Sequence, residues 1–380
     1  EGDREHAAGH VAVGADGDGR LTRVTDSLTG TQADFGYDED RRLRTVTLSN
    51  GEVITTTWDD AGRLTRLQSG NPVDAELTYD AGGRVDTVDL IAPLTPSGHL
   101  AAATAALTYD AASQVATAGY THDPRGRVTA APGRTFTWDG ASRLTAAGGA
   151  TLAYNGLGDL LTRTEGAATV RFHLNHALGM APVVAEQDAA TGRMLRYYVW
   201  TPGGRLLYLI DAEHGNAVRF FHFDPSGNTL ALTDAAGEVT DAWAYDPYGR
   251  ILARTGTSAQ PFTFAGAWGV RQEGADGTLY HMRARYYDAT TGRFLSPEPL
   301  WPQIDSPMAL NPYQYAAADP IRFADPSGLI IGAAMLTEEA ASVLRESLMM
   351  AIVNIALAGY EQAGVIGMIK ALQEIGRAHV

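Results

Sequence analysis

The side chains that could do chemistry gather in one segment rich in proline, glycine and aromatic residues, Arg283–Leu329. Its carboxylates are Asp288, Glu298, Asp305, Asp319 and Asp325. The chain has no cysteine, which excludes thiolate catalysis, disulfides and cysteine-ligated metals. Two carboxyl groups held close together split their pKa values, so one takes a proton from water while the other, protonated, polarises a peptide carbonyl. The sequence leaves open which of these side chains approach each other.

Metal and cofactor sites are not expected. The pair Asp16 and Asp18, each followed by glycine, resembles part of a calcium loop but lacks the remaining ligands, so we interpret it as a turn. His173 and His176 are three residues apart, without further ligands nearby. We therefore assign no metal and no cofactor.

A short pattern recurs through the chain before this segment. An aromatic residue is followed by Asp, and Arg or a polar substitute stands five residues after the aromatic. The clear copies begin at Tyr37, Trp58, Tyr79, Trp138 and Tyr245, and weaker copies begin at Tyr109, His122, Tyr154, Trp200 and Phe223. The first three aromatic residues are 21 residues apart. Such a period marks a repeat architecture.

The chemistry of this unit predicts a β-hairpin. Alternating threonine and apolar residues, as in Val53–Trp58, favour a strand. Asp at the start of the turn can bond the backbone two residues on, and Gly supplies a positive φ. We expect the aromatic ring and Arg to meet across the turn in a cation–π contact of about 0.5–1 kcal/mol. The repeat thus predicts a wide, coiled sheet without catalytic side chains; a propeller would need blades of about forty residues.

The hairpin unit resembles the YD repeat of the Rhs (rearrangement hotspot) proteins, which also occurs in Tc toxin C components and teneurins. The motifs Tyr280–Asp288, Thr291–Phe294, Asn311–Tyr315 and Asp325–Leu329 resemble the Rhs-associated core. This resemblance implies a mainly β fold, in which a spiralling hairpin sheet forms part of a hollow shell, or cocoon, closed by that core. It divides the chain into a YD-repeat shell (1–265), a core that acts as plug and autoprotease (266–329) and the start of an effector (330–380).

The resemblance also implies an activity, single-turnover aspartyl self-cleavage after Leu329, before Ile330. Its two carboxylates fall on Asp325 and on Glu298, where the family has Asp. The longer glutamate matters, because about 1 Å of misplacement can cost roughly a hundredfold in rate. The alternative reading is that both residues only cap turns, in a shell that keeps its cargo attached.

Arg293 has two open readings in this segment. It could position one of the carboxylates, or it could pair with Asp288 at the surface, and we slightly favour the surface pair.

A short α-helical tail is expected beyond the cut. Thr337 before Glu338 is a helix start, and apolar residues follow at helical spacing. The apolar stretch Leu348–Ala358 is too short for a transmembrane segment, and it favours a helix that lies on a membrane surface or packs against the protein. By resemblance this tail is the start of a truncated C-terminal effector. Residues 374–380 can be reverse-translated into a sequencing adapter, so we interpret them as artefactual.

The charge and the resemblance together suggest partners. A net charge of −15 argues against nucleic acid as a partner of the shell. The resemblance implies that the shell encloses its own C-terminal effector, with a type VI spike or Tc-type delivery components and an immunity protein as further partners. It implies a bacterial, secreted or cell-surface protein, delivered to a target cell in competition between bacteria. The alternative is a non-cleaving YD-repeat adhesion module.

Overall fold

The computed structural model describes residues 11–95, 106–274, 277–300, 310–329 and 332–333. These residues form antiparallel β-sheets and three short 3₁₀ helices: η1 (Ala212–His214), η2 (Gly266–Trp268) and η4 (Ala316–Ala318). The predicted helical tail lies outside the described residues, except for Gly332–Ala333, which is a strand. The mainly β fold class is confirmed.

The hairpin repeats form two sheets whose strands follow each other in chain order. The first sheet contains β1 (Val11–Ala15), β2 (Leu21–Asp26), β3 (Gln32–Tyr37), β4 (Leu43–Leu48), β5 (Val53–Trp58), β6 (Leu64–Ser69), β7 (Val73–Tyr79) and β8 (Val85–Ile91). The second contains β9 (Thr121–His122), β10 (Val128–Ala131), β11 (Arg134–Trp138), β12 (Leu144–Ala147), β13 (Ala150–Tyr154), β14 (Leu160–Glu165), β15 (Ala168–Leu174), β16 (Val183–Asp188), β17 (Met194–Trp200), β18 (Leu206–Asp211), β19 (Ala217–Phe223), β20 (Thr229–Thr233), β21 (Val239–Tyr245) and β22 (Ile251–Thr255).

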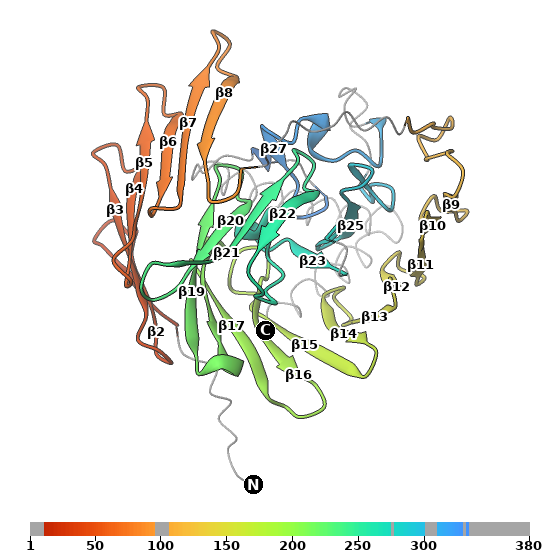
Figure 1. Cartoon of the computed structure of the whole chain (residues 1–380). Coiled ribbons are helices and arrows are strands. Elements are labelled where there is room, and N and C mark those ends of the chain that lie inside the picture. The colour runs from red at the N-terminus through yellow and green to blue at the C-terminus, as the bar shows by residue number, and fades with distance from the viewer. Residues whose placement is uncertain (1–10, 96–105, 275–276, 301–309, 330–331, 334–380) are drawn as a thin grey trace, which may run out of the picture.

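The second sheet curls around a compact core segment (Figure 1). That core contains β23 (Arg271–Glu273), β24 (Leu279–Met282), β25 (Arg285–Asp288) and β26 (Arg293–Phe294), followed by β27 (Phe323–Ala324) and β28 (Gly332–Ala333). Buried side chains on the concave face of the sheet and buried aromatics of the core form one hydrophobic cluster. The sheet is therefore a partial shell whose interior is filled by the core.

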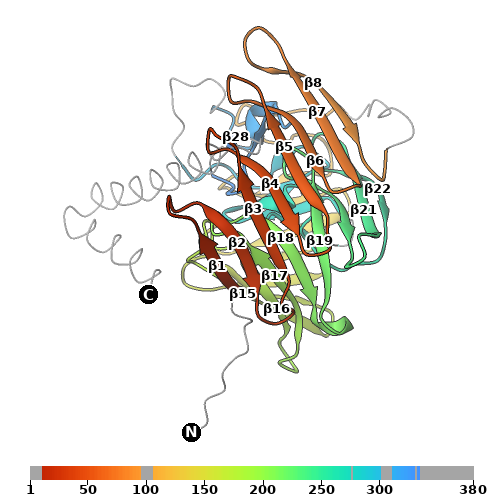
Figure 2. The same cartoon turned by 90° about the vertical axis from the view of Figure 1, so that its left-hand side faces the viewer.

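The first sheet packs on the opposite face of the second (Figure 2). Strands β2–β4 share a hydrophobic cluster with β17–β19. Along β18, Tyr208 and Ile210 face this cluster, while Leu209 between them faces the core, as the two-residue period of a strand requires. The repeat predicted one wide, coiled sheet. In the described residues the hairpins form two sheets that stack face to face.

Buried polar contacts tie the two layers together. The Tyr208 hydroxyl donates to Asp26 Oδ2 and to the Thr31 carbonyl, each at 3.0 Å. Elsewhere, Glu52 of the first sheet lies 3.2 Å from His222 of the second. Burial raises the pKa of Glu52, but hydrogen bonds from neighbours including His222 outweigh it and lower the pKa to about 2. A buried polar or charged group is costly without a partner, so these contacts fix the position of one layer relative to the other.

The turn chemistry of the repeat is confirmed by the hairpin between β5 and β6. Asp59 Oδ1 accepts from the backbone N–H groups of Ala61 and Arg63 at 3.0 and 2.8 Å. Gly62 has a φ of 76°, the left-handed conformation that favours glycine. The Arg63 guanidinium then pairs with Asp59 at 2.6 Å. Each turn is therefore a self-contained unit specified by five residues.

The expected contact between arginine and the aromatic of its own hairpin is wrong. Arg63 lies over the ring of Tyr79, in the next hairpin, at 4.4 Å. The Tyr79 hydroxyl in turn donates to the Leu64 carbonyl at 2.7 Å. Asp59, in the same turn as Arg63, pairs with the edge of the guanidinium. The flat face of the guanidinium therefore remains free to pack on the Tyr79 ring of the neighbouring hairpin. The arginine–aromatic pair thus joins consecutive hairpins rather than closing one.

Candidate active site

The tight hairpin between β24 and β25 provides a platform for the predicted cleavage segment, residues 325–329. The backbone N–H of Ala284 donates to the Ser327 carbonyl at 3.1 Å, and Arg283 Nη1 donates to the Pro326 carbonyl at 2.8 Å. Gly328 has a φ of 68°, and a Cβ there would lie 2.4 Å from the Met282 carbonyl oxygen. Only glycine lets the segment lie this close to the hairpin.

Asp325 organises the turn that ends at Leu329. Its carboxyl group is buried, with 2% of the residue exposed. Oδ1 accepts from the Ser327 hydroxyl at 2.9 Å and from the Leu329 backbone N–H at 3.1 Å. Asp325 therefore holds the amide of the residue that precedes the predicted scissile bond. Ile330, on the other side of that bond, lies outside the described residues.

Arg285 brings the two predicted carboxylates together. Its Nη2 lies 2.6 Å from Glu298 Oε2 and 3.2 Å from Asp325 Oδ2. Its Nε donates to the Gly328 carbonyl, and its guanidinium lies 3.5 Å from the centre of the Phe294 ring. One buried arginine thus contacts both acids and the backbone one residue before Leu329.

Glu298 has a raised pKa. Burial raises its pKa, and the attraction of Arg285 and a hydrogen bond from the Leu300 N–H oppose this effect, while the charge of Asp325 adds to it. The balance raises the pKa of Glu298 to about 7, from an ordinary value of 4.5. A carboxyl group that is partly protonated at neutral pH can donate a proton as well as accept one.

Other carboxylates of the segment are engaged elsewhere. Asp288 is fully buried and bonded by Arg134, with oxygens 3.1 and 2.6 Å from the two terminal nitrogens. Asp319 pairs with Arg322. Asp305 lies outside the described residues. Among the described carboxylates of this segment, Glu298 and Asp325 are the two that share a cation.

Arg293 lies away from both acids, and this differs from either reading of the sequence. Its Nη2 donates to Asn311 Oδ1 at 3.2 Å, and its guanidinium lies 4.8 Å from the Tyr109 ring centre. It does not pair with Asp288, because Arg134 of β11 occupies that carboxylate. The side chain closes the shell against the core instead.

The residue that sequence reasoning missed is Arg285. It stands in the motif Tyr280–Asp288, two residues after a second arginine, Arg283. The local sequence does not distinguish the two, since Arg283 binds backbone carbonyls and Arg285 binds the acids. The contacts of Arg283 with Pro326 and of Arg285 with Asp325 join residues that are 43 and 40 positions apart in the chain.

A metal site was also sought. No group of three or more His, Asp or Glu side chains that could hold a metal occurs among the described residues. In the same part of the chain, no helix is long and apolar enough to cross a membrane.

Comparisons with known proteins agree with the repeat and the fold. Residues 184–321 match the family model described as Teneurin YD-shell, and residues 16–53 match the RHS repeat model. Double-stranded DNA deaminase toxin A of Burkholderia cenocepacia (strain H111) is 36% identical over 102 residues, which cover 26% of this chain and 6% of that protein.

Solved structures show the same fold at low sequence identity. The crystal structure of TcdB2-TccC3 superposes with a TM-score of 0.61 at 17% identity, covering 84% of this chain and 21% of that one. The same complex without its hypervariable C-terminal region gives a TM-score of 0.60 at 17% identity, covering 84% and 20%. The chain therefore spans a small part of the length of its relatives. The matches of residues 16–53 to the RHS repeat and of residues 184–321 to the teneurin YD shell confirm the resemblance of this chain to the Rhs and YD-repeat proteins.

Proposed function

We propose that this chain is part of a bacterial toxin shell that encapsulates a C-terminal effector and releases it by cutting itself after Leu329. The observation that carries the proposal is the contact of Arg285 with both Glu298 and Asp325, beside the turn that ends at Leu329. In this proposal residues 1–265 are the shell, residues 266–329 the plug and protease, and residues 330–380 the start of the effector.

The proposed reaction hydrolyses the peptide bond between Leu329 and Ile330. Asp325 takes a proton from water as the water oxygen attacks the Leu329 carbonyl carbon. Glu298, protonated, donates its proton to the carbonyl oxygen. When the tetrahedral intermediate collapses, the C–N bond breaks and the Ile330 nitrogen takes the proton that Asp325 holds. One hydroxyl of the intermediate returns its proton to Glu298, and Leu329 keeps a carboxyl group.

The contacts of the two acids support these roles. Asp325 accepts hydrogen bonds from Ser327, Leu329 and Arg285, as an ionised carboxylate does. Glu298 has a pKa of about 7 and is half protonated near neutral pH. Arg285 contacts both acids, at 2.6 Å from Glu298 and 3.2 Å from Asp325, although glutamate stands where the family that this chain resembles has aspartate. Because each molecule cuts itself once, a slow reaction suffices.

The toxin role rests on the relatives. One is a DNA deaminase toxin, and TcdB2-TccC3 shares the fold. By that likeness the partners of this chain are its own effector, Tc-type or type VI delivery components and an immunity protein, and its place of action is a target cell.

The direct test is the size of the purified full chain on a denaturing gel. Native protein should separate into a shell and a fragment that begins at Ile330, and Asp325→Asn should stay whole. Asp319→Asn is the matched control, since Asp319 lies in the same segment with an arginine partner of its own, Arg322, and this variant should be cut like native. A whole native chain would defeat the protease role.

A second function, a non-cleaving adhesion module, is favoured by one observation, the match of residues 184–321 to the teneurin YD shell. In that role Glu298 and Asp325 would only hold the plug in place through Arg285. An uncut native chain with unchanged thermal stability in Asp319→Asn and lowered stability in Asp325→Asn would support it.

A further inference from the structure

The side chain of Arg283 joins three parts of the chain that lie far apart in the sequence. Its Nε donates to the Met180 carbonyl, its Nη1 to the Pro326 carbonyl and its Nη2 to the Trp268 carbonyl, each at 2.8 Å. Met180 lies between β15 and β16 in residues 175–182, which we call the shell turn, while Trp268 ends η2 and Pro326 belongs to the cleavage segment. One guanidinium therefore holds the shell, the start of the core and the predicted substrate together.

The hairpin that carries Arg283 does not itself require an arginine. Arg283 is the first residue of the two-residue turn between β24 and β25, and it has a φ of 51°. Hairpin turns favour glycine at such a position, because a side chain is strained there. The three acceptors are neutral carbonyl oxygens, and burial lowers the pKa of Arg283 to about 10 against the opposing charge of Asp325. The arginine is thus explained by the three segments that it reaches, not by the turn.

The guanidinium of Arg283 sets the position of the cleavage segment. Met180 and Trp268 anchor this group, and it holds the Pro326 carbonyl, one residue after Asp325. Without the shell turn as an anchor, this stretch of backbone would be free to shift against Glu298. Such a shift matters, because about 1 Å of misplacement can cost roughly a hundredfold in rate.

We propose that Arg283 is a positioning residue that makes the cut depend on the shell turn being seated on the core. In a chain whose sheet has not closed around the core, Met180 does not hold Arg283, and the bond after Leu329 stays whole. The effector is then freed only inside a finished shell. This inference rests on the proposed self-cleavage and adds a condition to it.

Arg283→Gly tests the contact, because glycine suits the positive φ of the turn and removes the whole side chain. The rate of cutting after dilution from urea should fall roughly a hundredfold. The slow cut should still start at Ile330 and keep the native fall in rate above pH 7, since Glu298 keeps the surroundings that raise its pKa. Guanidinium chloride far below its denaturing range should restore part of the rate by taking the place of the side chain, and sodium chloride should not.

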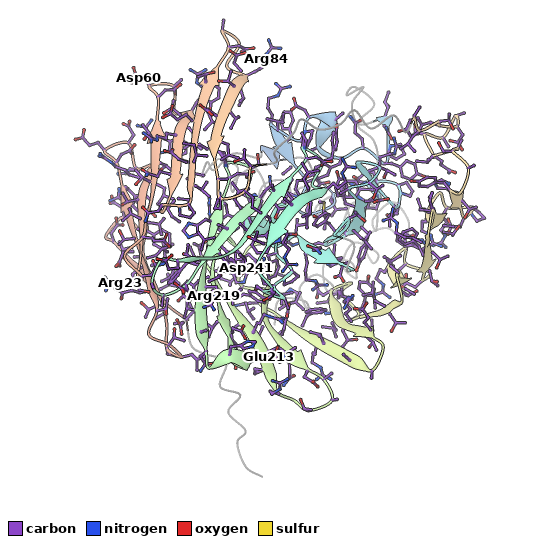
Figure 3. All side chains as sticks on the ribbon, in the orientation of Figure 1. Arg23, Asp60, Arg84, Glu213, Arg219 and Asp241 are labelled. Atoms are coloured by element: carbon purple, nitrogen blue, oxygen red, sulfur yellow. The ribbon has the colours of Figure 1, made fainter. Side chains whose placement is uncertain are left out.

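Arg84→Gly is the matched control for the loss of an arginine. Arg84 stands at the tip of the hairpin between β7 and β8, where its side chain is 67% exposed and pairs with Asp80 at 2.7 Å (Figure 3). This variant should be cut at the native rate. Asp325→Asn should stay whole with either salt, because guanidinium cannot replace a carboxylate.

Ala181→Pro tests the shell turn without changing Arg283. Ala181 has a φ of 48° and donates its backbone N–H to the Leu178 carbonyl at 2.9 Å, and proline can do neither. The variant should displace the Met180 carbonyl and be cut as slowly as Arg283→Gly, and the double variant should be no slower than either, because both changes break one contact. Ala167→Pro, in the exposed turn between β14 and β15, is its control and should be cut at the native rate.

The outcomes separate this inference from the reaction on which it rests. An uncut native chain would defeat self-cleavage and the inference with it. The inference alone is overturned if native chain is cut while Arg283→Gly or Ala181→Pro is cut at the native rate. It is also overturned if guanidinium restores no more of the Arg283→Gly rate than sodium chloride does, or if the effects of the two substitutions multiply in the double variant.

Discussion

The most specific consequence of the site is that self-cleavage should slow as pH rises through the pKa of Glu298. With a pKa of about 7, half of Glu298 carries the proton that the reaction needs at pH 7. At the ordinary value of 4.5, the protonated fraction would be only about 0.3%. Above pH 7 each further unit removes about nine-tenths of the protonated form, so the rate should fall about tenfold per unit.

The assay begins from uncut chain held unfolded in urea. Dilution into buffers between about pH 6 and pH 9 starts folding, and mass spectrometry follows the fragment that begins at Ile330. Glu298→Gln should abolish the fragment, because an amide cannot donate a proton and then accept one. Glu238→Gln, at an exposed turn, is the control and should cut at the native rate. A native rate that is flat or rises across this range would refute the acid role of Glu298.

The same pKa shift predicts a pH-dependent stability. Native Glu298 holds its proton up to about pH 7 and the unfolded residue only to 4.5, so between these values the folded chain binds more protons. Stability from this group is therefore full below pH 4.5 and falls as pH rises to about 7. The whole effect is about 3 kcal/mol at most. Urea unfolding of Glu298→Gln should lack this decline.

Three further substitutions test the packing around the site and between the layers. Arg285→Gln should stop cleavage and lower the free energy of unfolding by about 3–5 kcal/mol, because it leaves buried charge unpaired; urea denaturation and a gel measure both. Gly328→Ala should slow cleavage and destabilise by more than about 1 kcal/mol, since its φ of 68° and the nearby Met282 carbonyl leave no room for a Cβ. Tyr208→Phe should cost about 0.5–1.5 kcal/mol by removing the Tyr208 hydrogen bonds to Asp26 and the Thr31 carbonyl, which both keep other donors, and hydrogen exchange should rise in β2 and β3 while cleavage is unchanged.

The hairpins were predictable because their chemistry is local. Asp59, Gly62 and Arg63 lie within five residues, and each makes its turn contact inside that stretch. The partner of Arg63 was not predictable in the same way. Its ring belongs to Tyr79 in the next hairpin, and that choice depends on how neighbouring turns stack rather than on the turn itself.

Only part of the candidate site could be predicted from the sequence, because one of its contacts joins residues that are distant in the chain. Glu298 and Asp325 stand in recognisable motifs, whereas Arg285 joins them across 40 residues from Asp325. The stacking of the two layers was beyond prediction, because it depends on contacts such as Ser69 with His222, which are 153 residues apart. A repeat specifies its unit and its period, but not where its sheet folds back on itself.

The most direct measurement of the central idea is the N-terminal sequence of the small fragment released by the full chain. Two acids that share Arg285 beside the 325–329 turn should yield a fragment that starts at Ile330, and Asp325→Asn should yield none. A fragment with another first residue, or the same fragment from Asp325→Asn, would contradict cleavage by this pair.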